Sequence, residues 1–450
     1  MKAVETIEVA KNLLENYALC DHCLGRQFAM LGHGLTNYER GNAVKLLLIV
    51  EGNRLALDGN EDGKKILTSV SENGFSSVAK KTLEAIGVVA EEKREKRKKS
   101  CYICKGAFEH VEELAREVVK KFSEYEYEAF LIGVKIPIDI EEREDDLRAR
   151  FNIRWGESIK NELSREIGKA VAEITGKTVE HKSADVTAIV NPATKQIIIE
   201  VNPLFVAGRY RKLARGIPQS RWTCSKCKGR GCSDCNWTGR KYADSIEELI
   251  VTKIKERFNG VDAKLHAAGR EDVDVRMLGS GRPFIAEVKN PKIRKSDLDS
   301  LLSEVNNNAE GKIEVTDLKY SSRESIRRLK DEGQAVKVYR AVVEFERDVS
   351  NEELSLLKEG LDGKEVHQET PLRVMHRRSL KVRKKRLYGV EFKRLKSNLV
   401  EMLVRCQGGL YIKELINGDV GRTNPSIAEL LSISAKCIEL DVMDVCLEVD

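Results

Sequence analysis

Gly269-Arg-Glu-Asp-Val-Asp-Val-Arg-Met-Leu-Gly279 places two aspartates, Asp272 and Asp274, in a segment bounded by glycines. Glycine at both ends predicts a turn, and an aspartate in a glycine-rich turn most often serves only the turn itself. The residue types alone therefore leave open whether Asp272, Asp274 or neither takes part in chemistry.

On both sides of this loop the apolar pattern predicts mixed secondary structure. Upstream, the first 100 residues carry apolar positions at helical spacing, a further helix is expected over 158–174, and strands are expected over 130–137 and 196–201. At about 150 residues per domain, a chain of 450 residues predicts an α+β protein of about three parts. Downstream, apolar runs predict strands over 284–288, 312–315, 336–345, 387–392 and 399–406.

Composition limits the class of protein. The 78 basic and 72 acidic residues leave a net charge of +6, so any site for a polyanion must come from local clustering. No run approaches the roughly 18 consecutive apolar residues that cross a membrane. The N-terminal segment carries acids and lacks an apolar core, which predicts no secretory signal. We therefore expect a cytoplasmic protein without a membrane partner, and a monomer as the default for this length.

Eight of the eleven cysteines fall into four Cys-x-x-Cys pairs. Each pair places two thiolates on one tight turn, which suits two ligand positions of a tetrahedral zinc ion. Two pairs complete a closed structural site, so the sequence predicts structural zinc. The pairs are Cys20/Cys23, Cys101/Cys104, Cys224/Cys227 and Cys232/Cys235.

Sequence proximity favours joining the first pair to the second and the third to the fourth, although cross-pairing stays possible. A redox dithiol or unliganded buried cysteines are the competing interpretations. The four-residue gap between Cys227 and Cys232 leaves little room to bring both turns to one ion, so the second site is the weaker prediction. The remaining cysteines lie among apolar residues and are expected to pack in cores: Cys406, Cys437 and Cys446.

Two clusters of basic residues predict contacts with RNA. Each alone is typical of a solvated surface, but the two flank a cysteine-rich turn that is itself basic, and this arrangement favours a polyanion partner. Tyr210, inside the first cluster, is a candidate for stacking on a base. The residues expected to bind RNA are Arg209, Arg211, Lys212, Arg377 and Arg378.

The loop at 269–276 resembles the catalytic segment of pseudouridine synthases, in which a Gly-Arg-x-Asp turn carries the essential aspartate. Gly408-Gly-Leu-Tyr-Ile-Lys413 resembles the Gly-x-Tyr-Ile-Lys/Arg segment of the same superfamily. The series continues with Gly208-Arg-Tyr-Arg-Lys-Leu213 at the end of a THUMP-like segment, Thr370-Pro-Leu-Arg-Val-Met-His-Arg-Arg378 and Gly421-Arg-Thr-Asn-Pro-Ser-Ile427. With the split four-cysteine unit, nearly the whole chain is similar to the tenth family of pseudouridine synthases, found in archaea and eukaryotes.

The resemblance implies conversion of uridine to pseudouridine at position 55, and also position 54, of the tRNA T-loop, with no metal or organic cofactor in the chemistry. It implies Asp272 as the nucleophile, Tyr339 as the residue that stacks on the target base, and Tyr411 as a further substrate contact. Lys413, if adjacent, would hold Asp272 in its charged form. The reaction suits a carboxylate, because an N-glycoside becomes a C-glycoside only after attack on the base or ribose and loss of the C5 proton.

We therefore expect an α+β, multidomain chain. A zinc-bound helical segment is expected over 1–110, a THUMP-like RNA-binding domain over 111–221 and a four-cysteine zinc knuckle over 222–240. A pseudouridine-synthase-type catalytic domain with a mixed or antiparallel sheet is expected over 241–450. The knuckle has no place in the general family pattern, so its zinc rests on cysteine spacing alone.

Two other classes of protein compete with this interpretation. Another THUMP-bearing enzyme, a tRNA methyltransferase or thiolation enzyme, needs a glycine-rich cofactor loop or an ATP-binding Ser-Gly-Gly loop, and the sequence has neither. A non-catalytic RNA-binding protein would use only the basic clusters, and it predicts that Asp272→Asn leaves function intact.

Overall fold

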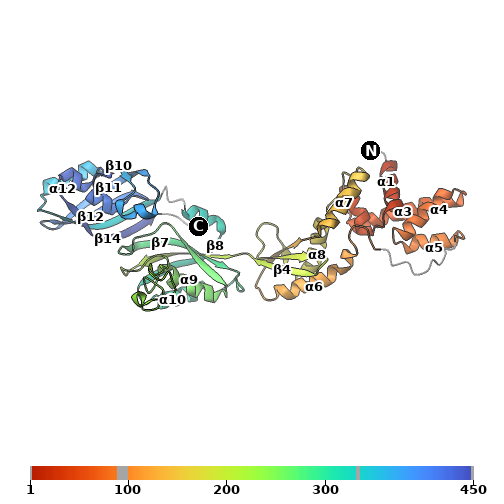
Figure 1. The fold of residues 1–450 in the computed structure, drawn as a ribbon, viewed down its shortest axis with the longest axis horizontal. Helices are drawn as coiled ribbons and strands as arrows, with labels where there is room; N and C mark the ends of the chain where they lie inside the picture. Colours follow the sequence, from red (N-terminus) through yellow and green to blue (C-terminus); the bar gives the residue numbers. More distant parts are fainter. Residues whose placement is uncertain (1–2, 89–99, 331–334, 447–450) are drawn as a thin grey trace. The chain divides into compact units, whose positions relative to one another are not determined.

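The computed structural model describes residues 3–88, 100–330 and 335–446. The chain divides into two compact units, Met1–Asn202 and Pro203–Asp450. Each unit has its own hydrophobic core and combines helices with a sheet (Figure 1). The predicted α+β class is confirmed.

The first unit begins with helices, as the apolar spacing predicts. A capping box opens the longest of them, since the Thr36 side chain accepts from the Glu39 amide and the Glu39 carboxylate accepts from the Thr36 amide. The helices are α1 (Ala3–Asn16), α2 (Asp21–Gly25), α3 (Asn37–Leu57), α4 (Glu61–Glu72) and α5 (Ser77–Ala85).

A four-stranded sheet in the order β2-β1-β3-β4 completes the first unit. Its strands β1 and β3 are parallel, and the crossover between them carries two helices. The strand and helix expected over 130–137 and 158–174 are confirmed as β1 and α8, and the strand expected over 196–201 is β4. The elements are α6 (Val111–Phe122), β1 (Ala129–Val134), α7 (Ile138–Arg150), α8 (Ile159–Thr175), β2 (Thr178–Val179), β3 (Val186–Asn191) and β4 (Gln196–Val201).

A buried arginine joins the helical segment to this sheet domain. Arg26 is fully buried, and its guanidinium contacts Glu144 of α7 at 2.8 Å and Glu162 of α8 at 3.1 Å. Removing one member of such a network leaves a buried charge without its partner. The helices and the four-stranded sheet also share one core, so they form a single unit.

The second unit is built on a ten-stranded sheet. The strand order is β13-β10-β11-β12-β9-β14-β7-β5-β8, with β6 paired to β7. Its strands are β5 (Leu204–Lys212), β6 (Asp262–Ala267), β7 (Arg276–Lys289), β8 (Ile313–Ser321), β9 (Val336–Phe345), β10 (Glu365–Glu369), β11 (Val382–Lys396), β12 (Leu399–Gln407), β13 (Thr423–Asn424) and β14 (Ala435–Cys446). Its helices are α9 (Ile246–Arg257), α10 (Leu298–Asn308), α11 (Arg323–Lys330), α12 (Asn351–Leu361), α13 (Ile412–Asn417) and α14 (Ile427–Leu431).

The five strands expected between residues 284 and 406 are confirmed as β7, β8, β9, β11 and β12. Strand β14 was not expected from the sequence, because charged residues interrupt its apolar positions. It also corrects the prediction that all three remaining cysteines lie in cores. Cys406 is buried, whereas Cys437 is only partly buried and Cys446 is exposed.

Strand β5 belongs to the sheet of the second unit, although we expected the THUMP-like domain to extend to residue 221. It pairs with β7 on one edge and β8 on the other. These partners satisfy backbone groups on both edges of the strand, which fixes β5 in this sheet. The first unit ends at Asn202, just before β5 begins.

Strand β14 sets the geometry of the site, because it lies between β9 and β7. Val442 is opposite Tyr339 on the antiparallel side and opposite Met277 on the parallel side. A single strand, β14, therefore lies between Tyr339 and the start of β7. The loop that carries Asp272 ends at β7 and so opens beside Tyr339.

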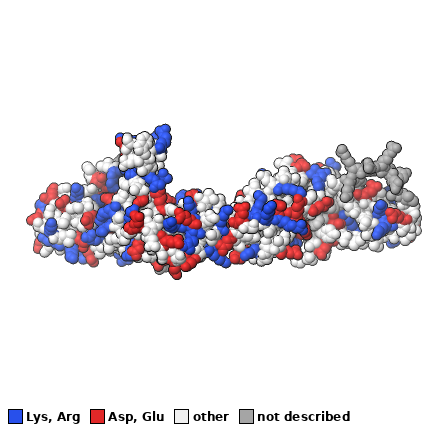
Figure 2. Space-filling model, turned by 90° about the horizontal axis from the view of Figure 1, so that it is seen from below, with Lys and Arg blue, Asp and Glu red and all other residues white. Residues whose placement is uncertain are grey.

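Charges of both signs are interspersed over the visible face of the molecule, in agreement with the small net charge (Figure 2). Among the helices in the described ranges, none has the length and apolar character needed to cross a membrane.

Candidate active site

The loop between β6 and β7 presents Asp272 to solvent on a tight turn. Gly269 has φ +77°, which only glycine adopts without strain, and the Val275 amide donates to the Asp272 carbonyl at 3.0 Å. About 30% of the Asp272 side chain is exposed. The carboxylate is thus held at the surface of a fixed turn.

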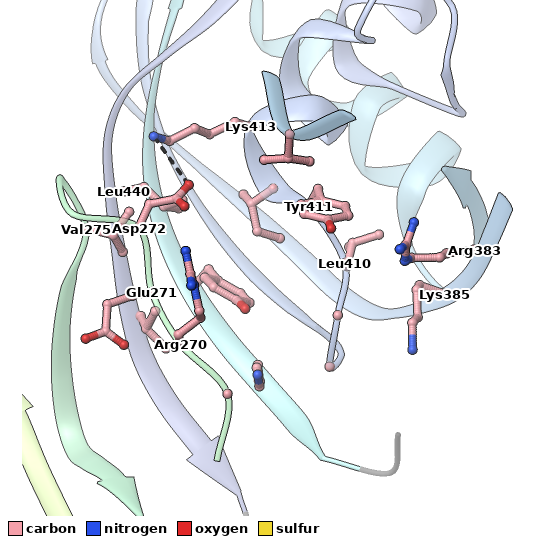
Figure 3. Close-up of a pocket in the computed structure, with 18 of the residues that line it drawn as sticks. Arg270, Glu271, Asp272, Val275, Arg383, Lys385, Leu410, Tyr411, Lys413 and Leu440 are labelled. Atoms are coloured by element: carbon pink, nitrogen blue, oxygen red, sulfur yellow. Dashed lines mark ion pairs between the residues drawn. The ribbon is translucent and has the colours of Figure 1, made fainter. Parts of the chain in front are cut away.

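A buried ion pair anchors the loop on the side away from Asp272. Glu271 and Arg282 are both 1% exposed, and the Arg282 Nε donates to the Glu271 carboxylate at 2.9 Å. The Tyr210 hydroxyl contacts both Glu271 oxygens at 3.2 Å, and Gln219 donates to Tyr210 and to the Gly269 carbonyl. Figure 3 shows Glu271 directed away from the space in front of Asp272.

A buried lysine forms hydrogen bonds with the backbone of the loop. The Lys212 Nζ donates to the Val273 carbonyl at 2.8 Å and to the Asp272 carbonyl at 3.3 Å. The residue is fully buried, and burial lowers the pKa of Lys212 to about 8. Lys212 therefore fixes the backbone on which Asp272 stands.

Two cations from distant segments meet the Asp272 carboxylate. The Arg373 Nη1 donates to Asp272 Oδ2 at 2.7 Å, while the Lys413 Nζ lies 3.9 Å from the same oxygen. Figure 3 shows Lys413 and Asp272 pointing toward one another. The predicted adjacency of Lys413 is present, but Arg373 makes the shorter contact.

Lys413 is shared between the two aspartates of the loop. Its Nζ is 2.7 Å from Asp274 Oδ2, closer than to Asp272. Burial opposes the charged form of Asp274, but the hydrogen bond and the charge of Lys413, with smaller contributions from a backbone hydrogen bond and Arg373, together lower the pKa of Asp274. Asp274 thus holds the lysine in place, whereas Asp272 faces the cleft.

The sequence prediction missed Arg373 as a site residue. It lies in the short helical segment Leu372–Arg377, and its Nε also donates to the nearly buried Glu414 at 2.6 Å. Glu414 in α13 follows Lys413 directly, so α13 positions one cation and orients the other. The segment that contains Arg373 stood out by resemblance, but 101 residues separate it from Asp272 and nothing in the sequence links the two.

Asp272, Arg373 and Lys413 line a cleft of about 670 Å³. The cleft is strongly basic around its two acidic lining residues, Glu271 and Asp272. Figure 3 shows Arg383 and Lys385 of β11 across the cleft from Asp272. Besides Arg373 and Lys413, its basic lining residues are Arg270, Lys337, Arg378, Arg383 and Lys385.

Two tyrosines line the same cleft, both of them singled out from the sequence. Tyr339 lies on β9 and Tyr411 immediately precedes α13. The fully buried Gln368 holds Tyr411 through both of its backbone groups, at 2.8 and 2.9 Å. The Tyr411 ring has the guanidinium carbons of Arg373 and Arg383 at 5.9 and 5.7 Å from its centroid. The ring therefore lies in a cationic setting suited to a nucleotide.

The expected RNA-binding surface on β5 needs correction. Lys212 and Tyr210 point into the core, since alternate residues of a strand face opposite sides, so neither reaches a phosphate or a base. Arg211 pairs with Glu314, and Arg209 donates to the backbone carbonyls of Ser280 and Gly281 in β7 and of Val445.

The second basic cluster, in contrast, contributes side chains to the cleft. Arg378 lines the cleft, as do Arg383 and Lys385. The side chain of Arg377 lies outside the part of the chain that the structure describes. Among the described lining residues of the cleft, the second cluster (within 376–386) thus contributes three, whereas the first cluster (within 209–215) contributes none.

The eight paired cysteines gather into two groups of four, with the pairing favoured by sequence proximity. One group is Cys20, Cys23, Cys101 and Cys104, and the other is Cys224, Cys227, Cys232 and Cys235. In each group all ligand atoms lie within 4.8 Å of one another. The close spacing of the second group is therefore no obstacle.

The sulfur separations fit a tetrahedral zinc ion. A Zn–S bond of about 2.3 Å sets the edge of a sulfur tetrahedron at about 3.8 Å. The Sγ atoms of Cys20 and Cys104 are 3.7 Å apart, and those of Cys227 and Cys235 are 3.8 Å apart. Backbone amides also donate to the sulfurs, such as that of Gly231 to Cys227 at 3.2 Å. Both groups could hold zinc.

Two family models match the chain. "Pus10, C-terminal" matches residues 205–446, and "Pus10 THUMP domain, archaeal" matches residues 114–191. The curated protein "tRNA pseudouridine synthase Pus10" of Methanocaldococcus jannaschii is 41% identical over 441 residues, covering 96% of this chain and 93% of that protein. Its namesake in Thermofilum pendens is 40% identical, covering 97% and 95%. One chain of a solved structure, "Crystal Structure of a Cbf5-Nop10-Gar1 Complex", is 20% identical over 44% of each chain, and its TM-score of 0.28 is too low to carry an argument.

Lys212 predicts a pH dependence of stability. Its pKa is about 8 in the folded chain and about 10.4 when unfolded, so between these values the unfolded state binds more protons and stability rises with pH. From pH 7 to 9.5 the free energy of unfolding should rise in the wild type, relative to Lys212→Met, by about 1 kcal/mol or more. Urea unfolding in a Trp155→Phe background measures this, because both remaining tryptophans lie in the second unit.

The exposed Lys228→Met serves as the control and should follow the wild-type profile. A difference between wild type and Lys212→Met that stays constant over this pH range would contradict the burial of a chargeable Lys212.

Proposed function

The chain belongs to the Pus10 family of tRNA pseudouridine synthases, and on this basis we propose that it isomerises uridine in the T-loop of tRNA, at position 55 and also position 54, with Asp272 as nucleophile. The observation that carries the proposal is the presentation of the Asp272 carboxylate on a fixed turn, in a basic cleft, against Arg373. We further propose that the enzyme acts as a monomer, since one unit of one chain supplies the described lining of this cleft. We also propose that it works in the cytoplasm.

The reaction breaks the N1–C1′ bond of uridine and forms a C5–C1′ bond. Asp272 attacks the ribose or the base and the N1–C1′ bond breaks. The uracil turns while the nucleotide is held, C5 bonds to C1′, and the bond to Asp272 breaks to restore the free carboxylate. The C5 proton leaves and N1 gains a proton, so the isomerisation needs no net oxidant or reductant. We propose that no metal or organic cofactor takes part in these steps.

Arg373 and Lys413 would stabilise the charged form of Asp272 in different ways. Arg373 makes the short contact, which orients the carboxylate toward the cleft, and Glu414 fixes the guanidinium from behind. Lys413 adds positive charge at 3.9 Å while Asp274 holds it. The attacking carboxylate is thus preorganised before substrate arrives.

The target uridine must leave the T-loop stack, at a cost of a few kcal/mol. Tyr339 is suited to stack on the displaced base, since it lines the cleft one strand from the start of β7. Tyr411 is suited to contact the nucleotide from the α13 side. Arg378, Arg383 and other basic lining residues would neutralise the flanking phosphates.

We propose a structural zinc ion in each cysteine group. The fit of the sulfur separations to a tetrahedron supports both sites. Neither group contributes a residue to the lining of the Asp272 cleft. The zinc ions would therefore stabilise folded segments and stay outside the chemistry.

Asp272→Asn should abolish pseudouridine formation. The change removes the negative charge but keeps the shape, and loss of a nucleophile lowers turnover by at least about 10³-fold. The assay incubates the protein with an unmodified tRNA transcript, without ATP or S-adenosylmethionine, and maps pseudouridine chemically at every uridine. Product should appear only in the T-loop.

Asp274→Asn is the matched control, because it lies on the same turn and should retain activity within about tenfold. If Asp274→Asn is the inactive variant while Asp272→Asn remains active, the nucleophile is Asp274. If the wild type modifies uridines outside the T-loop, the substrate site is wrong while the enzyme class stands.

Arg373→Met should lower kcat/KM by about 10- to 100-fold, because Asp272 loses the contact that orients it. It should also lower the melting temperature, since Glu414 is left buried without its cation. Arg373→Met combined with Glu414→Gln should recover the melting temperature but not the rate. Recovery of both would assign Arg373 a purely structural role.

Removal of zinc should affect the two cysteine groups independently. The wild type should carry two zinc ions per chain by elemental analysis, and Cys20→Ser or Cys227→Ser should each lose one. Because a structural zinc contributes about 10–16 kcal/mol of apparent folding free energy in small domains, each loss should lower the melting temperature of its segment. The exposed Cys446→Ser is the control and should keep both ions. A zinc-free wild type with unchanged melting behaviour would exclude structural metal.

A further inference from the structure

The four-cysteine knuckle (residues 222–240) carries the most exposed aromatic side chain in the described part of the protein. Trp237 is 77% exposed, whereas the next aromatic residue, Tyr38, is 51% exposed. Burying a large apolar side chain stabilises the folded state by roughly 1.5–3 kcal/mol, and an exposed indole does not gain this free energy. No packing requirement of the knuckle accounts for it, since the buried residues of its small core are its cysteines.

The backbone holds this indole outward in a strained conformation. Trp237 has φ +62° and follows Asn236 at φ +47°, a left-handed pair that a bulky residue rarely adopts. The Trp237 amide donates to the Cys232 carbonyl at 2.9 Å. A Cβ on Gly231 would lie 2.8 Å from the Trp237 carbonyl oxygen, so the glycine is required for this close approach. Strain of this kind is kept where the surrounding structure enforces it, and it often marks a functional position.

The knuckle that carries the indole has an excess of positive charge. The knuckle has four basic residues against one acid, Asp234, which pairs with Lys226. Lys228 and Arg230 are exposed on the same short segment. No other large apolar side chain of the knuckle is exposed, so the surface lacks the apolar core typical of a protein interface. An aromatic ring among cations fits a nucleic-acid base and its phosphates.

The base of the knuckle adjoins the catalytic loop. A small hollow is lined by Trp222 together with Arg270 and Asp272. The Lys241 Nζ, directly after the knuckle, lies 5.3 Å from the Trp222 ring centroid. The hollow shares Arg270 and Asp272 with the cleft in which the target uridine would react, so the base of the knuckle borders that cleft.

We propose that the knuckle is a second RNA-docking site, in which Trp237 stacks on an unpaired base of the tRNA other than the target uridine. Lys228 and Arg230 would neutralise the phosphates on either side of that base. The site would hold the tRNA while the target nucleotide enters the cleft. This inference rests on the proposed function, because it takes tRNA as the bound partner.

The test compares Trp237→Ala with Trp237→Phe, which keeps an aromatic face. Trp237→Ala should weaken binding of an unmodified tRNA transcript at least about fivefold, because base stacking on an aromatic ring is lost. Trp237→Phe should stay within about twofold of the wild type. At saturating tRNA the single-turnover rate of pseudouridine formation should be unchanged in both, since Trp237 is absent from the lining of the Asp272 cleft.

Fluorescence gives a direct readout of the contact. Binding of tRNA should quench the wild-type emission by a component that is missing in Trp237→Phe. Both variants should keep the wild-type zinc content, which verifies that the knuckle is folded. Unchanged tRNA affinity in Trp237→Ala, or a quench in Trp237→Phe as large as that of the wild type, would overturn the docking site. Failure of the proposed function gives a different result, because the wild type itself would then form no pseudouridine.

Discussion

The second unit depends on one buried carboxylate, Asp441 of β14. Its oxygens receive Arg276 at 2.8 Å and Arg215 at 2.7 Å, and Arg340 lies at 3.4 Å. Burial opposes the charged form, but hydrogen bonds from Arg276 and Arg215 hold the pKa of Asp441 below its usual range. Since Arg276 starts β7 and Arg340 follows Tyr339 on β9, this carboxylate fixes the register that sets the Asp272 loop beside Tyr339.

Within that register, the site separates groups that hold the loop from groups that face the cleft. Glu271 and Lys212 are buried and bind the loop to the sheet. Asp274 retains Lys413, which leaves Arg373 as the short contact of Asp272. Of the two acidic residues that line the cleft, only Asp272 is thus partly exposed, because Glu271 is buried against Arg282.

Patterns within short segments were predictable, whereas contacts between distant segments were not. The cysteine spacing gave both four-sulfur groups, and the apolar alternation over 336–345 gave β9. Arg373 was missed because its role arises only when the fold brings it to Asp272. The prediction that Lys212 binds RNA was wrong because a central strand buries alternate residues, so that Lys212 contacts the loop from the core side. Charge density along a sequence does not distinguish a buried basic side chain from one that faces solvent.

The late position of β14 in the chain has a consequence for biosynthesis. Asp441 contacts Arg215 across 226 positions, and the gap between β7 and β9 stays open until β14 fills it. Sheets closed by such distant pairings assemble slowly, and here almost the entire polypeptide must leave the ribosome first. A nascent chain that has not yet released β14 therefore lacks both the Asp441–Arg215 contact and the strand that joins β7 to β9.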